Sequence, residues 1–293
     1  MLVAGSKLRE WVGYRHANGY ASTGQGIDSE RNRVHSYFKH LGFFDYIGME
    51  DQGNRVGEAR GGQNFIPIRR IARPNIDVAG ASMEEWGVVI ERWYAALEEE
   101  ARMVAGVLAG SFDDSQALRT YKYAIREIIR NVFEHSQANE CFVFGQRWAN
   151  GHVEIAIIDE GVGIGHTLAC SHGIASDAEA LRAAVLPGVS RTAGNNRVHN
   201  VYDNSGFGLY ILSELGASFG WFTIGSGTAF LYGYKQTRAV GPSSFHGTFF
   251  GVHFNAAPRD ISSVLNDIIE AGEREAHAAG IQTRASGRSR IVT

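Results

Sequence analysis

The spacing of hydrophobic residues divides the chain into helical and extended segments. Apolar residues recur every three to four positions over residues 82–108 and 115–136, which predicts two amphipathic helices. Ser82 and Glu85 form a candidate capping box for the first. The period then shortens to two, which predicts strands over residues 141–144, 153–158, 221–224, 229–234 and 248–254, with helices near residues 178–185 and from residue 208. This order predicts an α+β fold, a two-layer sandwich of helices on a mixed β-sheet.

Two flanking regions differ from this central pattern. The pattern of residues 1–77 predicts a small N-terminal α/β extension. It has helical segments at residues 8–17 and 28–42 and an apolar strand at residues 65–69. Residues 258–293 predict a C-terminal helix and a mobile tail. The central domain is accordingly expected to span residues 78–257.

Composition and charge narrow the class of protein. The chain has 293 residues, of which 44% are hydrophobic and 20% charged, as in globular domains. Lys and Arg number 28 against 31 Asp and Glu, a net charge of −3, so no general attraction to nucleic acid or membranes is expected. The sequence shows no signal peptide and no apolar run of membrane-spanning length. Its two cysteines, Cys141 and Cys170, cannot build a disulfide framework, so we expect a cytoplasmic protein with Cys141 in the core.

Three short segments contain most of the residues that could take part in catalysis or ligand binding. The first lies on the second long helix, where Glu127, Asn131 and His135 follow one another at four-residue spacing. Four residues advance about 400° around a helix, so these side chains form one narrow stripe. An amide suits Mg²⁺ alongside phosphate oxygens, and a carboxylate suits a general base. Taken alone, the stripe is more typical of the solvated face of an amphipathic helix.

The second segment follows the apolar strand at residues 153–158 and contains Asp159, Gly161, Gly163 and Gly165. A buried carboxylate at a strand end needs a hydrogen-bond donor, and the exocyclic amino group of adenine is one. Alternating glycines allow the backbone to approach a flat ligand closely. The spacing matches neither the dinucleotide fingerprint nor the P-loop. A glycine-rich turn without a ligand is the alternative.

The third segment, residues 204–210, reads Asn-Ser-Gly-Phe-Gly-Leu-Tyr and starts an apolar helix. Backbone N–H groups at such a start favour anions, and glycine removes the Cβ that would block a phosphate. Ser190 and Arg191, in the polar stretch before it, are candidate phosphate contacts, although Arg191 could equally be an ordinary loop residue. This third segment is weak evidence when taken alone.

In this order, the three segments resemble the N, G1 and G2 boxes of the GHKL superfamily, the histidine-kinase-like ATPases with the Bergerat fold. The later pair Gly247-Thr248 resembles the G3 box. The resemblance covers roughly residues 78–257. It implies a Bergerat-type sandwich that binds ATP and Mg²⁺.

The resemblance also implies a role for each matching residue. Glu127 would be the catalytic base, Asn131 the Mg²⁺ ligand and His135 a further contact to ATP. Asp159 would recognise adenine N6, with Thr248 helping through a water. The other implied ATP contacts are Gly161 and Gly163 at the adenine, Gly206, Phe207, Gly208 and Leu209 at the phosphates, and Ser190 and Arg191 within an ATP lid formed by residues 165–205.

Several members of the superfamily fit the sequence poorly. Sensor kinases place an acidic residue directly after the phosphoacceptor histidine, and no histidine here has such a neighbour. Topoisomerase and mismatch-repair members add a second domain, for which residues 258–293 are too few. The stand-alone, anti-sigma-like type remains, which phosphorylates or sequesters a partner protein.

Two functions follow from the resemblance. The first is a bacterial regulatory Ser/Thr protein kinase or ATPase that acts on a protein partner. The alternative is an ATP-gated binding module that switches a partner without phosphotransfer. Residues 34–44 and 65–68 loosely resemble the last helix and strand of a STAS-like domain, and a helical packing extension is the alternative. The anti-sigma-like type implies a regulatory protein partner that is STAS-like or sigma-related. Nucleic-acid and membrane partners are not expected, and a homodimer is left open.

Overall fold

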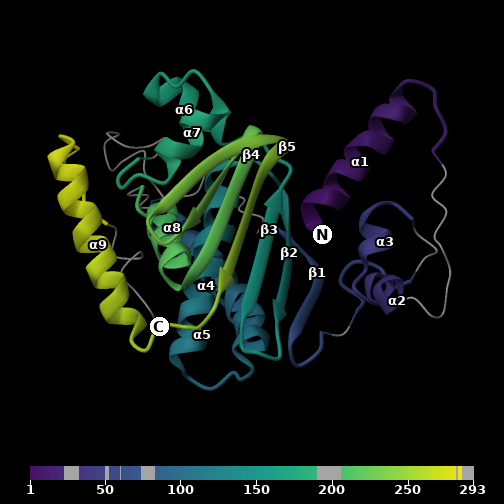
Figure 1. Cartoon of the computed structure of the whole chain (residues 1–293), viewed down its shortest axis with the longest axis horizontal. Coiled ribbons are helices and arrows are strands. Elements are labelled where there is room, and N and C mark those ends of the chain that lie inside the picture. Colours follow the sequence, from purple (N-terminus) through teal and green to yellow (C-terminus); the bar gives the residue numbers. More distant parts are fainter. Residues whose placement is uncertain are drawn as a thin grey trace.

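A five-stranded sheet forms the centre of the computed structural model (Figure 1), which describes residues 1–22, 33–49, 53–59, 61–73, 83–189, 206–281 and 283–285. In the order β1-β2-β3-β5-β4, the strands are β1 (Phe65–Ala72), β2 (Glu140–Arg147), β3 (Val153–Asp159), β4 (Gly220–Tyr234) and β5 (Thr237–Phe254). The α+β class is confirmed. The expected mixed sheet is wrong, because all four pairings between these strands are antiparallel.

The hairpin between β2 and β3 follows from its turn sequence. Gly151 adopts a φ of 84°, and the turn is closed by Trp148 N–H donating to the carbonyl of His152 over 2.8 Å. Glycine is favoured at this positive φ because it has no Cβ. Asn-Gly between two runs of alternating hydrophobicity is a typical hairpin turn, so residues 150 and 151 account for the connection between β2 and β3.

The last two strands are longer than the hydrophobic pattern predicts. The two strands expected at residues 221–224 and 229–234 form one strand, β4, which passes through a register shift at Gly227. β5 begins at Thr237 rather than at Thr248, although its first half contains glycine, proline and serine. Continuous pairing with β4 holds this half extended, so tertiary context overrides its weak strand propensity.

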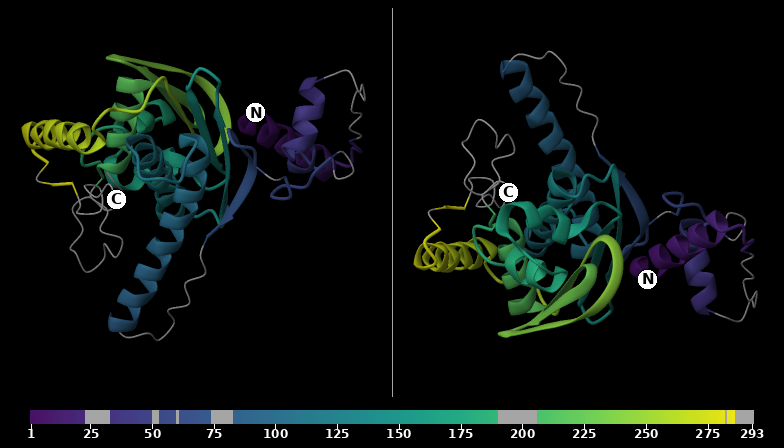
Figure 2. Two further views of the ribbon diagram at one scale, coloured as in Figure 1. Left: turned by 90° about the horizontal axis from the view of Figure 1, so that it is seen from below. Right: turned by 90° about the horizontal axis from the view of Figure 1, so that it is seen from above.

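Four helices pack on one side of the sheet (Figure 2): α4 (Met83–Ala109), α5 (Gln116–His135), α8 (Gly208–Phe219) and, outside α8, α9 (Ile261–Ala278). Both long helices are confirmed, and the Ser115 hydroxyl caps α5 by accepting from Leu118 N–H over 3.2 Å. Ser82 of the predicted capping box lies outside the described residues. The main core between helices and sheet includes Leu97, Ile125, Ile129, Val143, Ile155, Leu212, Phe222 and the expected Cys141.

Two short helices, α6 (Gly163–His172) and α7 (Asp177–Ala184), connect β3 toward α8. α7 confirms the short helix expected near residues 178–185, whereas α6 replaces part of a stretch expected to be a polar loop. The glycines at residues 163 and 165 lower the helix propensity of this segment, so the sequence alone does not predict α6. A tertiary hydrogen bond supports its first turn, since Ile164 N–H donates to the Ser226 hydroxyl over 2.9 Å.

Residues of the N-terminal region cover part of the opposite side of the sheet with α1 (Leu2–Ala17), α2 (Arg33–His40) and α3 (Phe43–Tyr46) (Figure 1). A second core forms here, built from Leu2, Phe43, Phe44, Tyr46, Ile68, Phe142, Ile158 and Phe245. β1 extends the central sheet by pairing with β2, so the region 1–77 shares the sheet of the region 78–257. No helix in the described part of the chain combines the length and apolarity needed to span a membrane.

Candidate functional site

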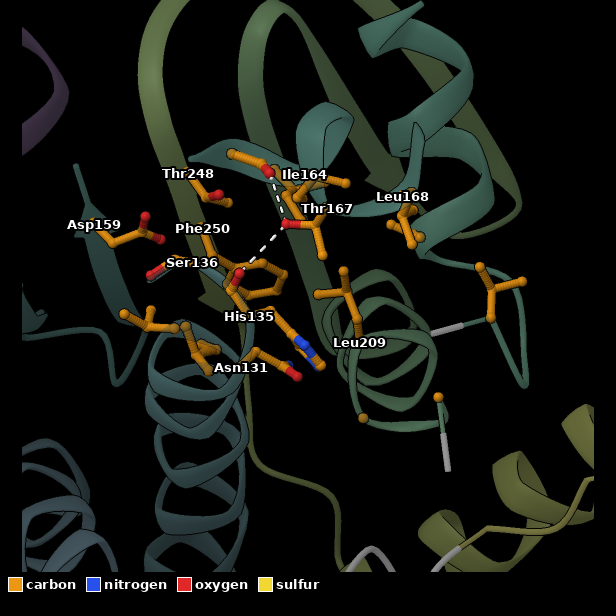
Figure 3. Close-up of a pocket in the computed structure, with 18 residues that line it drawn as sticks. Asn131, His135, Ser136, Asp159, Ile164, Thr167, Leu168, Leu209, Thr248 and Phe250 are labelled. Atoms are coloured by element: carbon orange, nitrogen blue, oxygen red, sulfur yellow. Dashed lines mark hydrogen bonds between the residues drawn. The ribbon is translucent and has the colours of Figure 1, made fainter. Parts of the chain in front are cut away.

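A cavity opens between the end of α5, the start of α8, α6 and the strands β3 to β5 (Figure 3). It has a volume of about 800 Å³ when its opening to solvent is counted. Its walls are mainly apolar and include Ile128, Val132, Ile164, Leu168, Leu209, Ile224 and Phe250. Among the described residues, six polar side chains line it, those of Asn131, His135, Ser136, Asp159, Thr167 and Thr248.

Asp159 is the buried carboxylate of this cavity. It ends β3 with 2% of its surface exposed, and its side chain points toward Ser136 (Figure 3). Burial raises its pKa from 3.8 to about 6, against the lowering effect of hydrogen bonds from the backbone of Gly161 and Thr248 and from Ser136. The carboxylate keeps acceptor capacity beyond these partners. An amino group entering the cavity would meet a strong acceptor there.

Backbone glycines fix the turn that follows Asp159. Gly161 N–H donates to Asp159 Oδ1 over 2.9 Å, and a Cβ at Gly161 would overlap the carbonyl oxygen of Ser136. Gly163 has a φ of 78°, and a Cβ there would lie 2.6 Å from the Ser226 hydroxyl. Side chains are thus excluded at both positions, and Gly163 itself lines the cavity.

Asn131 and His135 reach the same cavity from the last turns of α5 (Figure 3). The Asn131 Nδ2 atom is buried and has no hydrogen-bond partner among the described residues. A buried polar atom without a partner costs free energy unless a ligand or water satisfies it. The amide of Asn131 is therefore available to a ligand of this cavity.

Glu127 does not join Asn131 and His135 in the cavity. Its side chain is fully buried, and it pairs with Arg130 Nη2 at 2.9 Å and with Arg126 Nη2 at 3.2 Å. The expected stripe drifts by about 40° with every four residues, and Glu127 is not among the residues that line the cavity. Its carboxylate nevertheless lies directly behind the start of α8, because a Cβ at Gly208 would be 2.8 Å from Glu127 Oε2 and 3.7 Å from Asn131 Nδ2.

The start of α8 forms another wall, where Gly206, Gly208 and Leu209 line the cavity. Gly206 has a φ of 74°, and a Cβ there would lie 2.7 Å from the backbone of Gly188. Phe207 is fully buried and packs edge-on against Tyr210, so it supports the helix start instead of lining the cavity. Ser190 and Arg191 lie outside the described residues, as does much of the expected lid.

Three hydroxyl residues of the site escaped the sequence analysis. Ser226 donates to the Gly247 carbonyl over 2.8 Å while accepting from Ile164 N–H, so it ties β4 to β5 and to α6. Thr167 donates to the Gly163 carbonyl over 2.9 Å (Figure 3). Ser136 follows the last residue of α5 and contacts Asp159. Only the position of Ser136, directly after the His135 motif, offered a sequence signal for any of them.

The arrangement can hold a flat polar ligand that carries an anionic group. Asp159 supplies the acceptor, apolar walls enclose a flat ring, and the backbone at the start of a 12-residue helix can face an anion. Within the described residues, no group of three His, Cys, Asp or Glu side chains could hold a metal ion.

No protein-family model matches the chain, and a search of curated proteins finds no significant match. The function is therefore inferred from the residues and from the geometry of the site.

Proposed function

We propose that the cavity binds an adenine nucleotide with Mg²⁺ and that the protein is a cytoplasmic, bacterial regulatory ATPase or Ser/Thr protein kinase of the histidine-kinase-like type. The observation that supports this best is the buried Asp159 carboxylate in an apolar cavity closed by glycine backbone. Burying a carboxylate is costly. Such a residue is expected where a ligand supplies a matching donor, and the adenine amino group is one.

Adenine would enter with its N6 amino group toward Asp159. The carboxylate would accept a hydrogen bond from this amino group. Thr248, beside Asp159 on β5, would contact the base through a water. Guanine carries a carbonyl oxygen at the corresponding position, which would face the carboxylate without a proton between them. We therefore expect ATP to bind at least about 100-fold more tightly than GTP.

Mg²⁺ fits this site as an ion carried by the nucleotide. Asn131 offers one neutral amide whose buried Nδ2 has no partner in the described chain, so the amide is free to turn its oxygen toward the cavity. Phosphate oxygens and waters would complete the shell of such an ion. The bound ion would neutralise phosphate charge, while the backbone of Gly206 and Gly208 at the start of α8 would receive the phosphates.

The second candidate function is an ATP-gated binding module that switches a protein partner without phosphotransfer. The ion pairs of Glu127 favour it, because a carboxylate held by Arg126 and Arg130 outside the lining is poorly placed to accept a proton from a nucleophile. In the kinase or ATPase, Glu127 would have to leave these partners once the nucleotide is bound. The partner protein, STAS-like or sigma-related by the sequence resemblance, would be common to both.

Calorimetric titration of the full chain with ADP and ATP, with and without Mg²⁺, tests nucleotide binding. Asp159→Ala should abolish it while the protein stays folded by circular dichroism. Asp267→Ala on exposed α9 is the matched control and should bind like the wild type. Equal affinity of wild type and Asp159→Ala, or no binding by the wild type, would overturn the proposal.

Phosphate release from radiolabelled ATP separates the two candidate functions. In the enzyme, Glu127→Gln should keep ATP affinity but lose turnover by about 100-fold or more. In the binding module, wild type and Glu127→Gln should release phosphate equally slowly. Capture of a partner in the presence of the labelled ATP then shows whether label is transferred to it.

A further inference from the structure

The residue after Asp159 faces away from the cavity and contacts the N-terminal helix. Ser6 Oγ of α1 donates to Glu160 Oε1 over 2.7 Å, and Arg9 Nη1 lies 3.5 Å from the same oxygen. Ser6 is 5% exposed, so its hydroxyl is held within the packing of α1 on the sheet. Two consecutive residues thus make contacts on opposite sides of the sheet: Asp159 lines the cavity, and Glu160 contacts α1.

Arg9 connects the same contact to the rest of the N-terminal region. Its guanidinium lies over the ring of Tyr46 from α3 at 5.2 Å and over the ring of Phe142 from β2 at 5.5 Å. Lys7 Nζ approaches the Ser244 hydroxyl on β5 at 3.4 Å. The first turns of α1 are therefore joined to β2, β5 and the end of β3 by polar and cation–π contacts.

The backbone around Glu160 leaves little room for independent movement. Gly161 N–H donates to Asp159 Oδ1, so the turn containing Glu160 also orients the carboxylate in the cavity. Gly247, at a φ of 97°, packs its backbone so closely that a Cβ would overlap the Asp159 carbonyl oxygen and lie 2.8 Å from Glu160 Cα. Displacing Glu160 would therefore displace Asp159, Gly161 or the neighbouring Thr248.

We propose that Glu160 is a positioning residue that holds the Asp159–Gly161 turn ready for the nucleotide, and that α1 docking on Glu160 and nucleotide binding reinforce each other. The inference rests on the proposed nucleotide site. Without the contact to Ser6 and Arg9, the turn would be held less firmly before the ligand binds, and affinity would fall by the cost of restoring its position. By linkage, nucleotide binding must then stabilise α1 on the sheet by the same factor.

The test uses the full chain with Ser6→Ala, Glu160→Gln and the double variant, and Glu10→Gln as matched control. Glu10 lies on the same helix, is 52% exposed and pairs with Lys7. At pH 8, where Asp159 is ionised, calorimetry should show ADP affinity lowered about threefold to tenfold in both single variants. The ADP affinity of the double variant should be no lower than that of Glu160→Gln, because both substitutions remove the same hydrogen bond between Ser6 and Glu160. Hydrogen exchange of residues 1–9 should slow on ADP addition in the wild type and in Glu10→Gln, but not in Glu160→Gln.

A pH profile shows separately how the charge of Glu160 acts on Asp159. Burial is the main cause of the raised pKa of Asp159, hydrogen bonds from Gly161, Thr248 and Ser136 lower it, and the charge of Glu160 raises it further, with the Cys141 thiol opposite on β2. Glu160→Gln should therefore move the acid limb of ADP affinity to lower pH, whereas Ser6→Ala should leave its midpoint in place.

The outcomes distinguish this inference from the proposed function. In one outcome, the wild type binds ADP while Glu160→Gln and Ser6→Ala have ADP affinities within twofold of it and the hydrogen exchange of α1 does not change on ADP addition. In that case Glu160 only anchors α1 and the inference is wrong. If the wild type binds no ADP, the proposed function fails and the inference fails with it. If Glu160→Gln does not fold, Ser6→Ala alone decides through the same two measurements.

Discussion

Arg130 and Glu127 form a buried ion pair one turn apart on α5, with arginine Nη2 2.9 Å from glutamate Oε2. Arg130 Nε also lies 3.5 Å from Glu134 Oε1, so one guanidinium serves two buried carboxylates. Burial opposes its charge, but the two carboxylates outweigh this effect and raise the pKa of Arg130. The hydroxyl of Tyr94 on α4 donates to Glu134 over 3.4 Å, which extends the network across the helix pair.

Arg130→Met should destabilise the protein strongly, because it leaves Glu127 and Glu134 buried without their main partner. We expect a loss of about 3 kcal/mol in the free energy of unfolding, measured by urea titration. The double variant with Glu127→Gln should recover part of this loss, because one of the unpaired charges is gone. A loss in Arg130→Met no larger than that of an exposed variant such as Arg274→Met would show that the network contributes nothing.

Asp159→Asn should stabilise the protein at neutral pH. Burial raises the pKa of Asp159 from 3.8 to about 6, so the folded state binds its proton more tightly than the unfolded state does. The ionised carboxylate therefore costs stability above pH 6, and this cost vanishes below pH 4. We expect Asp159→Asn to gain about 3 kcal/mol at pH 7 to 8 and less than about 1 kcal/mol at pH 4, by thermal or urea unfolding. Asp267→Asn should show no such pH-dependent difference.

Nucleotide affinity should fall in acid for the same reason. The amino group of adenine needs the ionised form of Asp159, so the proton and the ligand compete for the carboxylate. Below pH 6, affinity should fall by up to about tenfold per pH unit. Because the phosphates of ADP also titrate near pH 6, adenosine, which has none, should be titrated by calorimetry in parallel. A flat profile for adenosine between pH 5 and 8 would contradict the role of Asp159.

The elements around the site could be predicted wherever local sequence decides the structure. The apolar stripe of α5 depends on residues three to four positions apart, and the helix predicted over residues 115–136 is confirmed as Gln116–His135. The turn at Gly151 is likewise set by a few neighbouring residues. α6 and the first half of β5 could not be predicted. Ser226, which supports α6, lies 62 positions away in the sequence from Ile164. The first half of β5 has weak strand propensity of its own and is held extended by its pairing with β4.

The candidate site was predictable in its residue types but not in its geometry. Asp159, Asn131 and His135 do line one cavity, because a strand end and a helix end fix their directions. Glu127 has the right spacing, yet its direction is decided by Arg126 and Arg130, whose pairing a helical stripe does not reveal. Its role as catalytic base stays a prediction. Likewise, the contact of Ser6 with Glu160 joins residues 154 positions apart, which no local pattern indicates.

Gly161→Ala should damage both folding and nucleotide binding. The new Cβ would overlap the Ser136 carbonyl oxygen, which accepts the backbone N–H of Val162, so the turn after Asp159 would have to move. We expect a loss of about 1–3 kcal/mol in unfolding free energy and at least a tenfold weaker ADP affinity. Gly13→Ala is the matched control, since a Cβ on that exposed turn of α1 meets nothing within 4 Å. It should stabilise the helix by about 0.5–1 kcal/mol. Equal behaviour of the two variants would contradict the described turn.

Asn131→Ala should weaken nucleotide binding only where binding depends on Mg²⁺. The amide lines the cavity with a buried Nδ2 that lacks a partner in the described structure, and its loss removes the protein ligand proposed for Mg²⁺. Affinity for ATP in the presence of Mg²⁺ should fall by about tenfold or more, whereas affinity for ADP in EDTA should change by less than about threefold. Calorimetry under the two conditions measures both effects, with the exposed Asn139→Ala as control. An equal loss with and without Mg²⁺ would mean that Asn131 contacts the nucleotide itself and holds no ion.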